Sequence, residues 1–292
     1  MLSMSRILAP VDFSERCLGM MPYVKSLAKR YDSEVILLHV VNPFYTVPST
    51  ALSGPVMIPI PNSAVTDAQA RLDKFAVAEL SKLRVRRLLY EGDPASQIVQ
   101  FAKTKKVQLI AMSTHGYGTL RRFLIGSETA KILHDVSCPV LTGVHTEKRA
   151  ASKTVKVSRI LCAVNLGSES TRVVAWASRL ASDLNAQLRL LHVKAPFNAG
   201  IEGILPSGLI GRIEKSERER FEKLIRKSGV TIDAADLREG DVPETVCDLA
   251  KSTRADLLVV GRGAPDESGG RLTAHAYAII RQSPCPVISV RY

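Results

Sequence analysis

The feature that constrains this chain most is that its second half repeats its first half. The matching segments are 6–12 with 159–165, 35–40 with 188–193, 91–93 with 239–241, 107–112 with 255–260, and 138–141 with 285–288. Matches at a nearly constant spacing over the whole length indicate one structural unit that is present twice. We therefore predict two domains, residues 1–147 and 157–292, joined by a basic linker at 148–156.

Within each half, short apolar segments alternate with segments of helical periodicity. In the first half the expected strands are 6–12, 34–41, 85–90, 109–112 and 138–144, and the expected helices include 15–31, 67–83 and one that begins at Ser127. Strands that alternate with helices predict an α/β fold with a parallel sheet. Each domain is thus predicted to be a doubly wound, five-stranded parallel sheet of the Rossmann-like type. Ligands of such sheets bind beyond the carboxyl ends of the strands.

One connection is too long for a simple turn. The segment from Pro43 to Asn62 is rich in proline and apolar residues. Connections of this length in compact domains usually have a function. We expect a flap, a lid or a contact surface here.

The overall charge favours anionic partners without identifying one. The formal net charge is +12 and the isoelectric point is near 9.6, with the excess spread over both halves. The most basic short stretch, 82–87, alternates like a strand with one solvated face and contains no aromatic residues for stacking on bases. We therefore expect no nucleic-acid partner.

The five cysteines form no CxxC pair or other metal-ligand spacing. Such usage favours a reducing compartment and mostly buried thiols. The chain begins with no long apolar signal region and has no apolar run of membrane-spanning length. We expect a cytoplasmic protein with no membrane partner.

The stretch around residues 109–128 predicts a site for a triphosphate. A buried strand at 109–112 leads into a polar turn that ends at Gly116, and Gly126 and Ser127 open a helix. The N-terminus of a helix carries partial positive charge and unpaired amides, and glycines let the main chain approach a phosphate closely. Asp12 ends the neighbouring first strand. It is expected either to cap the helix that follows or to contact ribose or a metal ion.

These residues also carry a resemblance to a known family. The chain resembles a tandem universal stress protein over nearly its whole length. ATP-binding members of that family carry the signature Gly-x-x-Gly, nine residues, then Gly-Ser/Thr. Here Ser113-Thr-His-Gly116 and Gly126-Ser127 fit that signature in every position except the first.

The resemblance implies an adenine nucleotide alpha hydrolase-like fold that binds ATP, with Mg²⁺ as its companion ion. The implied nucleotide contacts are Pro10, Val11, Asp12, Val40, Met112, Ser113, Gly116, Gly126, Ser127 and Glu128, with Asp12 also a weak metal ligand. It further implies that the final strands, 140–144 and 287–290, pair within the chain as an internal pseudo-dimer, which dimerises again.

Two departures from the family pattern bear on function. Ser113 replaces a glycine, which would cause strain only if the backbone there is left-handed. In the second half Asn165 replaces aspartate, and the loop equivalent to the phosphate loop is acidic. We therefore expect the second site to be weak or empty.

The function expected is a regulatory, ATP-binding stress protein. The alternatives are a tandem stress protein that binds no nucleotide and acts as an interaction module, and a slow ATPase. No catalytic residue is assigned, because the sequence offers no Ser-His-Asp order, no paired carboxylates beside a base and no P-loop lysine. His39 and His192, at equivalent positions in buried strands, are expected to be core histidines with satisfied hydrogen bonds.

Overall fold

The computed structural model describes residues 1–47, 56–114, 125–144, 155–196, 208–263 and 274–291. The chain divides into two compact units. The N-terminal unit comprises residues 3–138 and 146–155, and the C-terminal unit comprises 1–2, 139–145 and 156–292. Each is described separately below.

The N-terminal unit is built on a parallel sheet. Its strands are β1 (Arg6–Pro10), β2 (Glu34–Val41), β5 (Arg84–Glu91) and β6 (Leu109–Met112), in the order β6-β1-β2-β5. All three neighbouring pairs are parallel. The helices are α1 (Glu15–Tyr31), α2 (Asn62–Lys74), α3 (Pro94–Thr104) and α4 (Ser127–Asp135). Since the chain leaves β1 toward β2 and later returns to β6 on the other side, the strand order reverses between β1 and β6, where such folds hold ligands.

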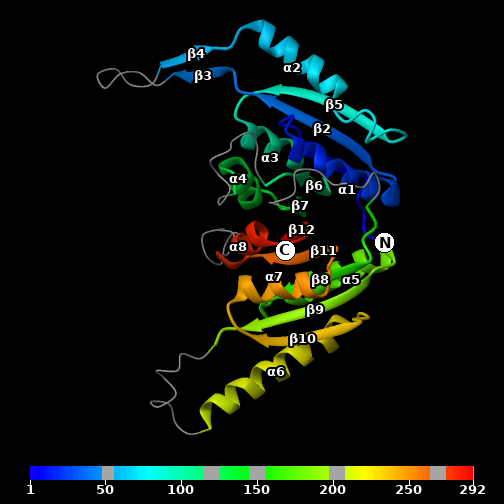
Figure 1. Cartoon of the computed structure of the whole chain (residues 1–292), viewed down its shortest axis with the longest axis vertical. Helices are drawn as coiled ribbons and strands as arrows, with labels where there is room; N and C mark the ends of the chain where they lie inside the picture. Colours follow the sequence, from blue (N-terminus) through cyan, green and yellow to red (C-terminus); the bar gives the residue numbers. More distant parts are fainter. Residues whose placement is uncertain (48–55, 115–124, 145–154, 197–207, 264–273, 292) are drawn as a thin grey trace. The chain divides into compact units, whose positions relative to one another are not determined.

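The C-terminal unit repeats this plan. Its strands are β8 (Arg159–Val164), β9 (Gln187–Lys194), β10 (Ala234–Glu239), β11 (Leu257–Arg262) and β12 (Val287–Arg291), and its helices are α5 (Ser170–Leu184), α6 (Leu209–Ser228), α7 (Val242–Ser252) and α8 (Ala274–Gln282). The order is β10-β9-β8-β11-β12, all parallel (Figure 1). The predicted α/β fold with two doubly wound, mostly parallel sheets is confirmed.

The last strand from the first repeat, β7 (Val140–Thr142), belongs to the C-terminal unit. It pairs antiparallel with β12, with Leu141 opposite Ile288. The predicted pairing of the two final strands within one chain is confirmed. Leu141 is 1% exposed and Ile288 is fully buried, so the pairing forms part of that unit's core.

Local sequence signals explain where α1 and α3 begin. The Ser14 hydroxyl accepts a hydrogen bond from the Cys17 amide and caps α1. Asp93 caps α3 by accepting from the Ser96 amide, with Pro94 in the first turn. The serine and aspartate side chains accept hydrogen bonds from amides that a helix start leaves unpaired. Proline in the first turn has no amide hydrogen, so it leaves none unpaired there.

The predicted helix 67–83 is wrong at both ends. The observed α2 begins at Asn62 and ends at Lys74, after which Phe75 is extended and Ala76 has a φ of 53°. Arg87 on β5 donates to the carbonyls of Leu72 and Phe75, at 3.0 Å each. This arginine satisfies carbonyls that a continuing helix would have used, so α2 ends there.

The long proline-rich connection contains a second, small sheet. β3 (Phe44–Val47) and β4 (Val56–Pro59) pair antiparallel and form a two-stranded sheet of their own. Figure 1 shows this pair extending away from the parallel sheet of its unit.

Candidate functional site

At the end of β1 the chain makes a tight turn over Asp12. The Val11 amide donates to the Leu38 carbonyl at 2.9 Å, so β1–β2 pairing continues past Pro10. One carboxylate oxygen of Asp12, Oδ1, then accepts from the Ser14 amide at 2.9 Å and from the Ser14 hydroxyl at 2.7 Å. This oxygen holds the turn that leads into α1, whereas the residue that caps α1 is Ser14 and not Asp12. The nucleotide role of Asp12 stays a prediction.

Phe13 occupies a left-handed conformation, with a φ of 61°, directly after Asp12. Such a conformation is costly for a bulky residue and is maintained only by its surroundings. Its ring lies 4.4 Å from the His39 ring and 5.8 Å from the Phe75 ring, and the Arg71 guanidinium lies 4.3 Å above it. The sequence analysis assigned no role to Phe13 or Arg71. No local sequence pattern identifies Phe13 or Arg71, because the two residues are far apart in the sequence and meet only where the end of β1 contacts α2.

His39 serves the structure of this turn. Its Nδ1 lies 2.7 Å from the Val11 carbonyl oxygen, and burial lowers the pKa of His39 below its ordinary value. Since the carbonyl only accepts, Nδ1 carries the hydrogen and donates it. The expectation that His39 has a satisfied hydrogen bond is confirmed.

The start of α4 lies against the end of β6. The Gly126 amide donates to the Thr114 carbonyl at 3.1 Å, and the Thr129 hydroxyl donates to the Ser113 carbonyl at 3.4 Å. The next amides of the first turn, those of Ser127 and Glu128, have no acceptor within the helix. The described ends of the predicted cradle, Thr114 and Gly126, therefore adjoin each other, while Gly116 lies outside the described residues.

The described residues do not require glycine at position 126. Its φ is −58°, which any residue adopts, and among the described atoms a Cβ added there would approach none closer than the Thr114 carbonyl oxygen at 3.7 Å. Ser113, which replaces the glycine of the family signature, is not among the residues with positive φ. The serine thus causes no left-handed strain.

Glu128 directs its carboxylate away from the start of its own helix. Its Oε2 accepts from the Ala95 amide at 3.0 Å, in the first turn of α3. Lys131, one turn further along α4, lies 3.0 Å from the carboxylate of Asp93. These two contacts join α4 to α3, and they engage the Glu128 side chain, while the role of Glu128 as a phosphate contact stays a prediction.

The other predicted contacts lie at the strand ends. Pro10 is opposite Leu38 in the β1–β2 pair, and Val40 is opposite Tyr90 in the β2–β5 pair. Val40 is 9% exposed and Met112, the last residue of β6, is 7% exposed. The fold therefore puts Pro10, Val40 and Met112 at the carboxyl edge of the sheet, as expected of parallel strands.

The C-terminal unit forms a similar turn without the carboxylate. The Asn165 side-chain oxygen accepts from the Gly167 amide at 3.0 Å and from the Ser170 hydroxyl at 3.1 Å. Leu166 has a φ of 58°, and His192 Nδ1 lies 2.9 Å from the Val164 carbonyl oxygen. Leu166 and His192 thus match Phe13 and His39 of the first repeat. His192 is a core histidine, but only its Nδ1 is hydrogen-bonded, because among the described residues its buried Nε2 has no hydrogen-bond partner. The expectation of a fully satisfied histidine is therefore wrong for His192.

A cavity of about 380 Å³ opens beside this second turn. Its lining comes from the ends of β8, β9 and β11 and from α5, α7 and α8, and it includes Asn165, Ser170, His192 and Gly261. The volume lies within the range of small-molecule pockets. Lack of space therefore gives no reason for the predicted weak or empty nucleotide site of the second repeat. That prediction rests instead on the residues that differ from the first repeat, such as Asn165 in place of Asp12.

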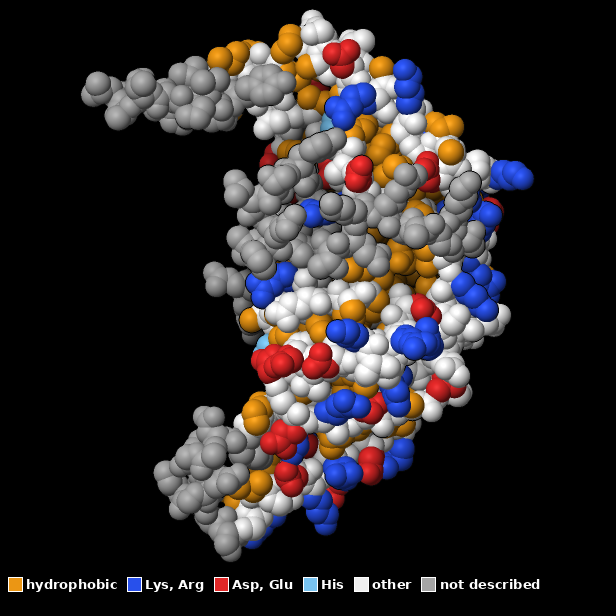
Figure 2. Space-filling view, viewed as in Figure 1, with side chains coloured by type: hydrophobic (Ala, Val, Ile, Leu, Met, Phe, Trp, Pro, Cys, Tyr) orange, Lys and Arg blue, Asp and Glu red, His pale blue; other side chains and the backbone are white. Residues whose placement is uncertain are grey.

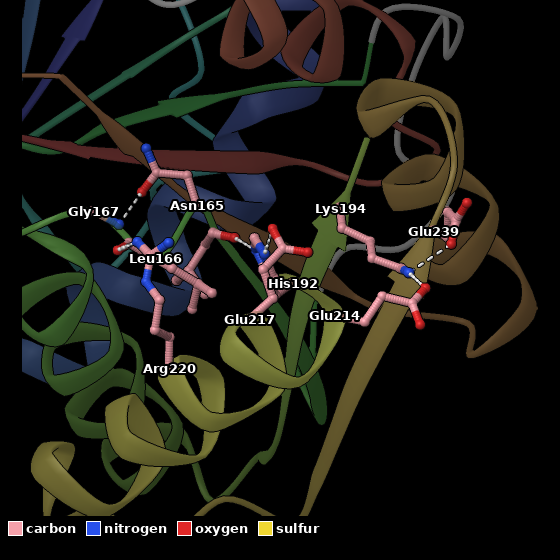
Figure 3. A network of polar contacts seen from close by, with 10 residues as sticks. Asn165, Leu166, Gly167, His192, Lys194, Glu214, Glu217, Arg220 and Glu239 are labelled. Atoms are coloured by element: carbon pink, nitrogen blue, oxygen red, sulfur yellow. Dashed lines mark hydrogen bonds and ion pairs between the residues drawn. The ribbon is translucent and has the colours of Figure 1, made fainter. Parts of the chain in front are cut away.

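Polar contacts from α6 border this turn (Figure 3). Arg220 donates to the Leu166 carbonyl at 3.1 Å, and Glu217 lies 3.9 Å from His192 Nε2. Lys194 at the end of β9 lies 2.6 Å from Glu214. It also lies 2.7 Å from the carboxylate of Glu239. In the first repeat an arginine stacks on Phe13, whereas here an arginine binds the backbone of Leu166.

The cysteines fit the expectation of mostly buried thiols. None of the five forms a disulfide, and Cys17, Cys162 and Cys285 are buried. Burial raises the pKa of Cys162 and that of Cys285 to about 12.

Within the described ranges no three His, Cys, Asp or Glu side chains are grouped so as to hold a metal ion. In those same ranges no helix combines the length and hydropathy that crossing a membrane requires.

The chain is similar to known proteins over both halves. The family model described as "Universal stress protein family" matches residues 4–142 and 156–291. Universal stress protein MJ0531 from Methanocaldococcus jannaschii is 32% identical over 138 residues, 47% of this chain and 79% of that protein. Universal stress protein MJ0577 from the same organism is 27% identical over 149 residues, 47% of this chain and 92% of that protein. A solved universal stress protein from Archaeoglobus fulgidus shares the fold, with a TM-score of 0.69 and 18% identity over 99% of this chain and 97% of the other.

Proposed function

Because the chain belongs to the universal stress protein family, we propose that its N-terminal unit binds an adenine nucleotide, ATP, at the carboxyl ends of β1 and β6. The family resemblance supplies the ligand class. In this proposal the turn at Pro10, Val11 and Asp12, with Val40, contacts adenine and ribose. Met112, Ser113 and Gly116 border the ribose and phosphates.

The observation that carries the proposal is the arrangement of α4. Its N-terminus lies against the end of β6 through the 3.1 Å bond between the Gly126 amide and the Thr114 carbonyl. Neither the backbone conformation nor the packing of the described residues requires glycine at 126. A group that approaches the main chain from outside does explain it. The amides of Ser127 and Glu128 would then bind the phosphates at the positive end of the helix.

The role that fits this site is regulatory binding. The family resemblance pairs ATP with Mg²⁺, whose usual ligands are phosphate oxygens, water and one or two carboxylates. Asp12 retains one carboxylate oxygen, Oδ2, outside the bonds to Ser14, so it is the side chain proposed to contact the ion. We assign no catalytic base.

The test is to substitute Ser127 by glutamate and to measure ATP binding by calorimetry, together with adenine nucleotide released on denaturing the purified protein. Ser127 is exposed, and a carboxylate in the first turn of a helix stabilises the helix. We therefore expect Ser127→Glu to keep or raise the melting temperature while the added negative charge weakens ATP binding at least tenfold, about 1.4 kcal/mol.

The matched control is Ala274→Glu, which adds the same charge at the start of α8 in the second repeat. Ala274 is exposed, like Ser127. ATP binding by the Ala274→Glu protein is expected to equal that of the parent. A parent that neither releases nor binds adenine nucleotide would refute the proposal, as would equal losses in the two variants.

A further inference from the structure

The turn after β1 contains a residue in a conformation that its own type disfavours. Phe13 has a φ of 61°, which bulky side chains rarely adopt. On either side of it, Asp12 Oδ1 accepts hydrogen bonds from the amide and the hydroxyl of Ser14. The backbone of Phe13 joins the two ends of these bonds, so its conformation determines whether they can form. Conformations of this kind persist only where the surroundings hold them, and they gather at functional sites.

The ring of Phe13 is contacted by side chains from β2 and from the end of α2. Its centroid lies 4.4 Å from that of the His39 ring and 5.8 Å from that of the Phe75 ring, which meets it edge to face. The Arg71 guanidinium, from α2, lies 4.3 Å from the same centroid. A guanidinium over an aromatic face attracts the ring. These contacts oppose the release of Phe13 into a more favourable backbone conformation.

The end of α2 that carries Arg71 is itself anchored to the sheet. Arg87 on β5 donates to the carbonyls of Leu72 and Phe75, at 3.0 Å each. Leu72, the residue after Arg71, is fully buried. The Arg71 side chain is exposed, however, so it contributes little to the core. Arg71 can therefore be replaced without opening the core, and the contact that is lost is the one with Phe13.

The second repeat supports the same position of its turn by a different contact. Leu166, which matches Phe13, has a φ of 58°, and Arg220 of α6 donates to its carbonyl at 3.1 Å (Figure 3). α6 precedes the third parallel strand of its unit, as α2 does in the first repeat. In each unit an arginine from this helix thus contacts the left-handed residue of the turn. Two different contacts at one position indicate that the turn needs support from outside.

We propose that Arg71 is a positioning residue for the nucleotide site of the N-terminal unit, because it stacks on Phe13 and so holds the turn formed by Val11 and Asp12. This role rests on the proposed function, in which that turn contacts adenine and ribose. Arg71 is not among the residues proposed to contact ATP, so it acts through the Phe13 ring. A turn that is ordered before the ligand arrives lowers the entropy cost of binding.

Attraction between ATP and the charge of Arg71 is the competing explanation. The chain has 40 lysine and arginine residues, and such side chains are spread over the described surface in view (Figure 2). One exposed cation among so many changes the long-range field little, and salt screens it. Lys74 is another exposed cation, in the last turn of the same helix. The contact with Phe13 is what distinguishes Arg71 from Lys74.

The test is calorimetric measurement of ATP binding by the full chain and its variants. We expect Arg71→Ala to weaken ATP binding about two- to fivefold, the range for an exposed cation–π contact. Lys74→Ala removes the same charge from α2 and should bind ATP like the parent. Glycine adopts positive φ without a steric cost, so Phe13→Gly allows the turn but removes the ring. In the Phe13→Gly background, Arg71→Ala should cause no further loss.

Hydrogen exchange provides a second readout that does not need ATP. The Ser14 amide donates to Asp12 at 2.9 Å, so the exchange rate of its hydrogen, measured by NMR, reports on opening of the turn. Arg71→Ala should raise this rate about two- to fivefold, for the same lost contact. Lys74→Ala should leave the rate unchanged.

The outcomes separate this role of Arg71 from ATP binding itself. ATP binding by Arg71→Ala that equals that of the parent, or equal losses in Arg71→Ala and Lys74→Ala, would overturn the positioning role and leave the proposed function intact. A loss that persists in full in the Phe13→Gly background would also overturn it, because Arg71 would then act without the ring. A parent that binds no ATP would refute the proposed function and the positioning role together, and the Ser14 exchange would still show whether Arg71 holds the turn.

Discussion

At the scale of single residues, Asp93 combines a helix cap with an ion pair, and its counterpart Asp241 provides a comparison for the cap. Both cap a helix, Asp93 through the Ser96 amide and Asp241 through the Glu244 amide. Asp93 also lies 3.0 Å from Lys131. Together, the helix-capping bonds and the lysine lower the pKa of Asp93 to about 2 from 3.8. The ionised carboxylate therefore stabilises the fold fully above about pH 4, and this stabilisation is lost as the pH falls toward 2.

Asp93→Asn keeps a good capping residue but removes the charge. We expect it to lower the free energy of unfolding at pH 7, with the deficit relative to the parent shrinking as the pH falls from about 4 to about 2. Urea titrations at several pH values measure this. Asp241→Asn is the control for capping alone. A deficit for Asp93→Asn that is constant from pH 7 to pH 2 would contradict the assignment.

At the scale of elements, the end of α2 is set by a side chain from another strand. Arg87 on β5 donates to the Leu72 and Phe75 carbonyls. Arg87→Ala removes both donors from partly buried carbonyls, so the free energy of unfolding should fall by about 1–3 kcal/mol. Urea unfolding measures the loss. Arg86→Ala, at the exposed neighbouring position, should change stability by less than about 0.5 kcal/mol. Equal effects of the two substitutions would show that the carbonyl contacts are not what stabilises this end.

At the scale of the whole molecule, β7 lies within the first family match but belongs to the C-terminal unit. Leu141 is 1% exposed opposite Ile288. Leu141→Ala should therefore destabilise that unit by about 2–5 kcal/mol. The only tryptophan, Trp176, lies in α5, so its fluorescence reports on the C-terminal unit. Leu109→Ala, in the fully buried β6 of the N-terminal unit, is the comparison. The tryptophan transition should shift more for Leu141→Ala, and equal shifts would contradict the placement of β7.

The features that the sequence could predict are those encoded by neighbouring residues. Ser14 and the pair Asp93-Pro94 mark helix starts, because a cap acts within one turn of its own position. The apolar strands and the repeat predicted both doubly wound sheets, since burial on two faces needs continuous apolar runs. The start of α4 at Ser127 was also predicted, although no side chain caps this helix. The nucleotide site built on it remains a prediction.

Other features depend on residues that are far apart in the sequence. The conformation of Phe13 depends on His39 and Arg71, and the end of α2 depends on Arg87. The Glu128 carboxylate accepts a hydrogen bond from the first turn of α3, and β3 and β4 pair with each other in a sheet of two strands. The sequence by itself therefore determined the duplication, the fold class and the caps, which arise from periodicity and local hydrogen bonds. The tertiary structure decided where α2 ends, which unit holds β7 and which apolar surface stays exposed, because those depend on which distant groups are available as partners.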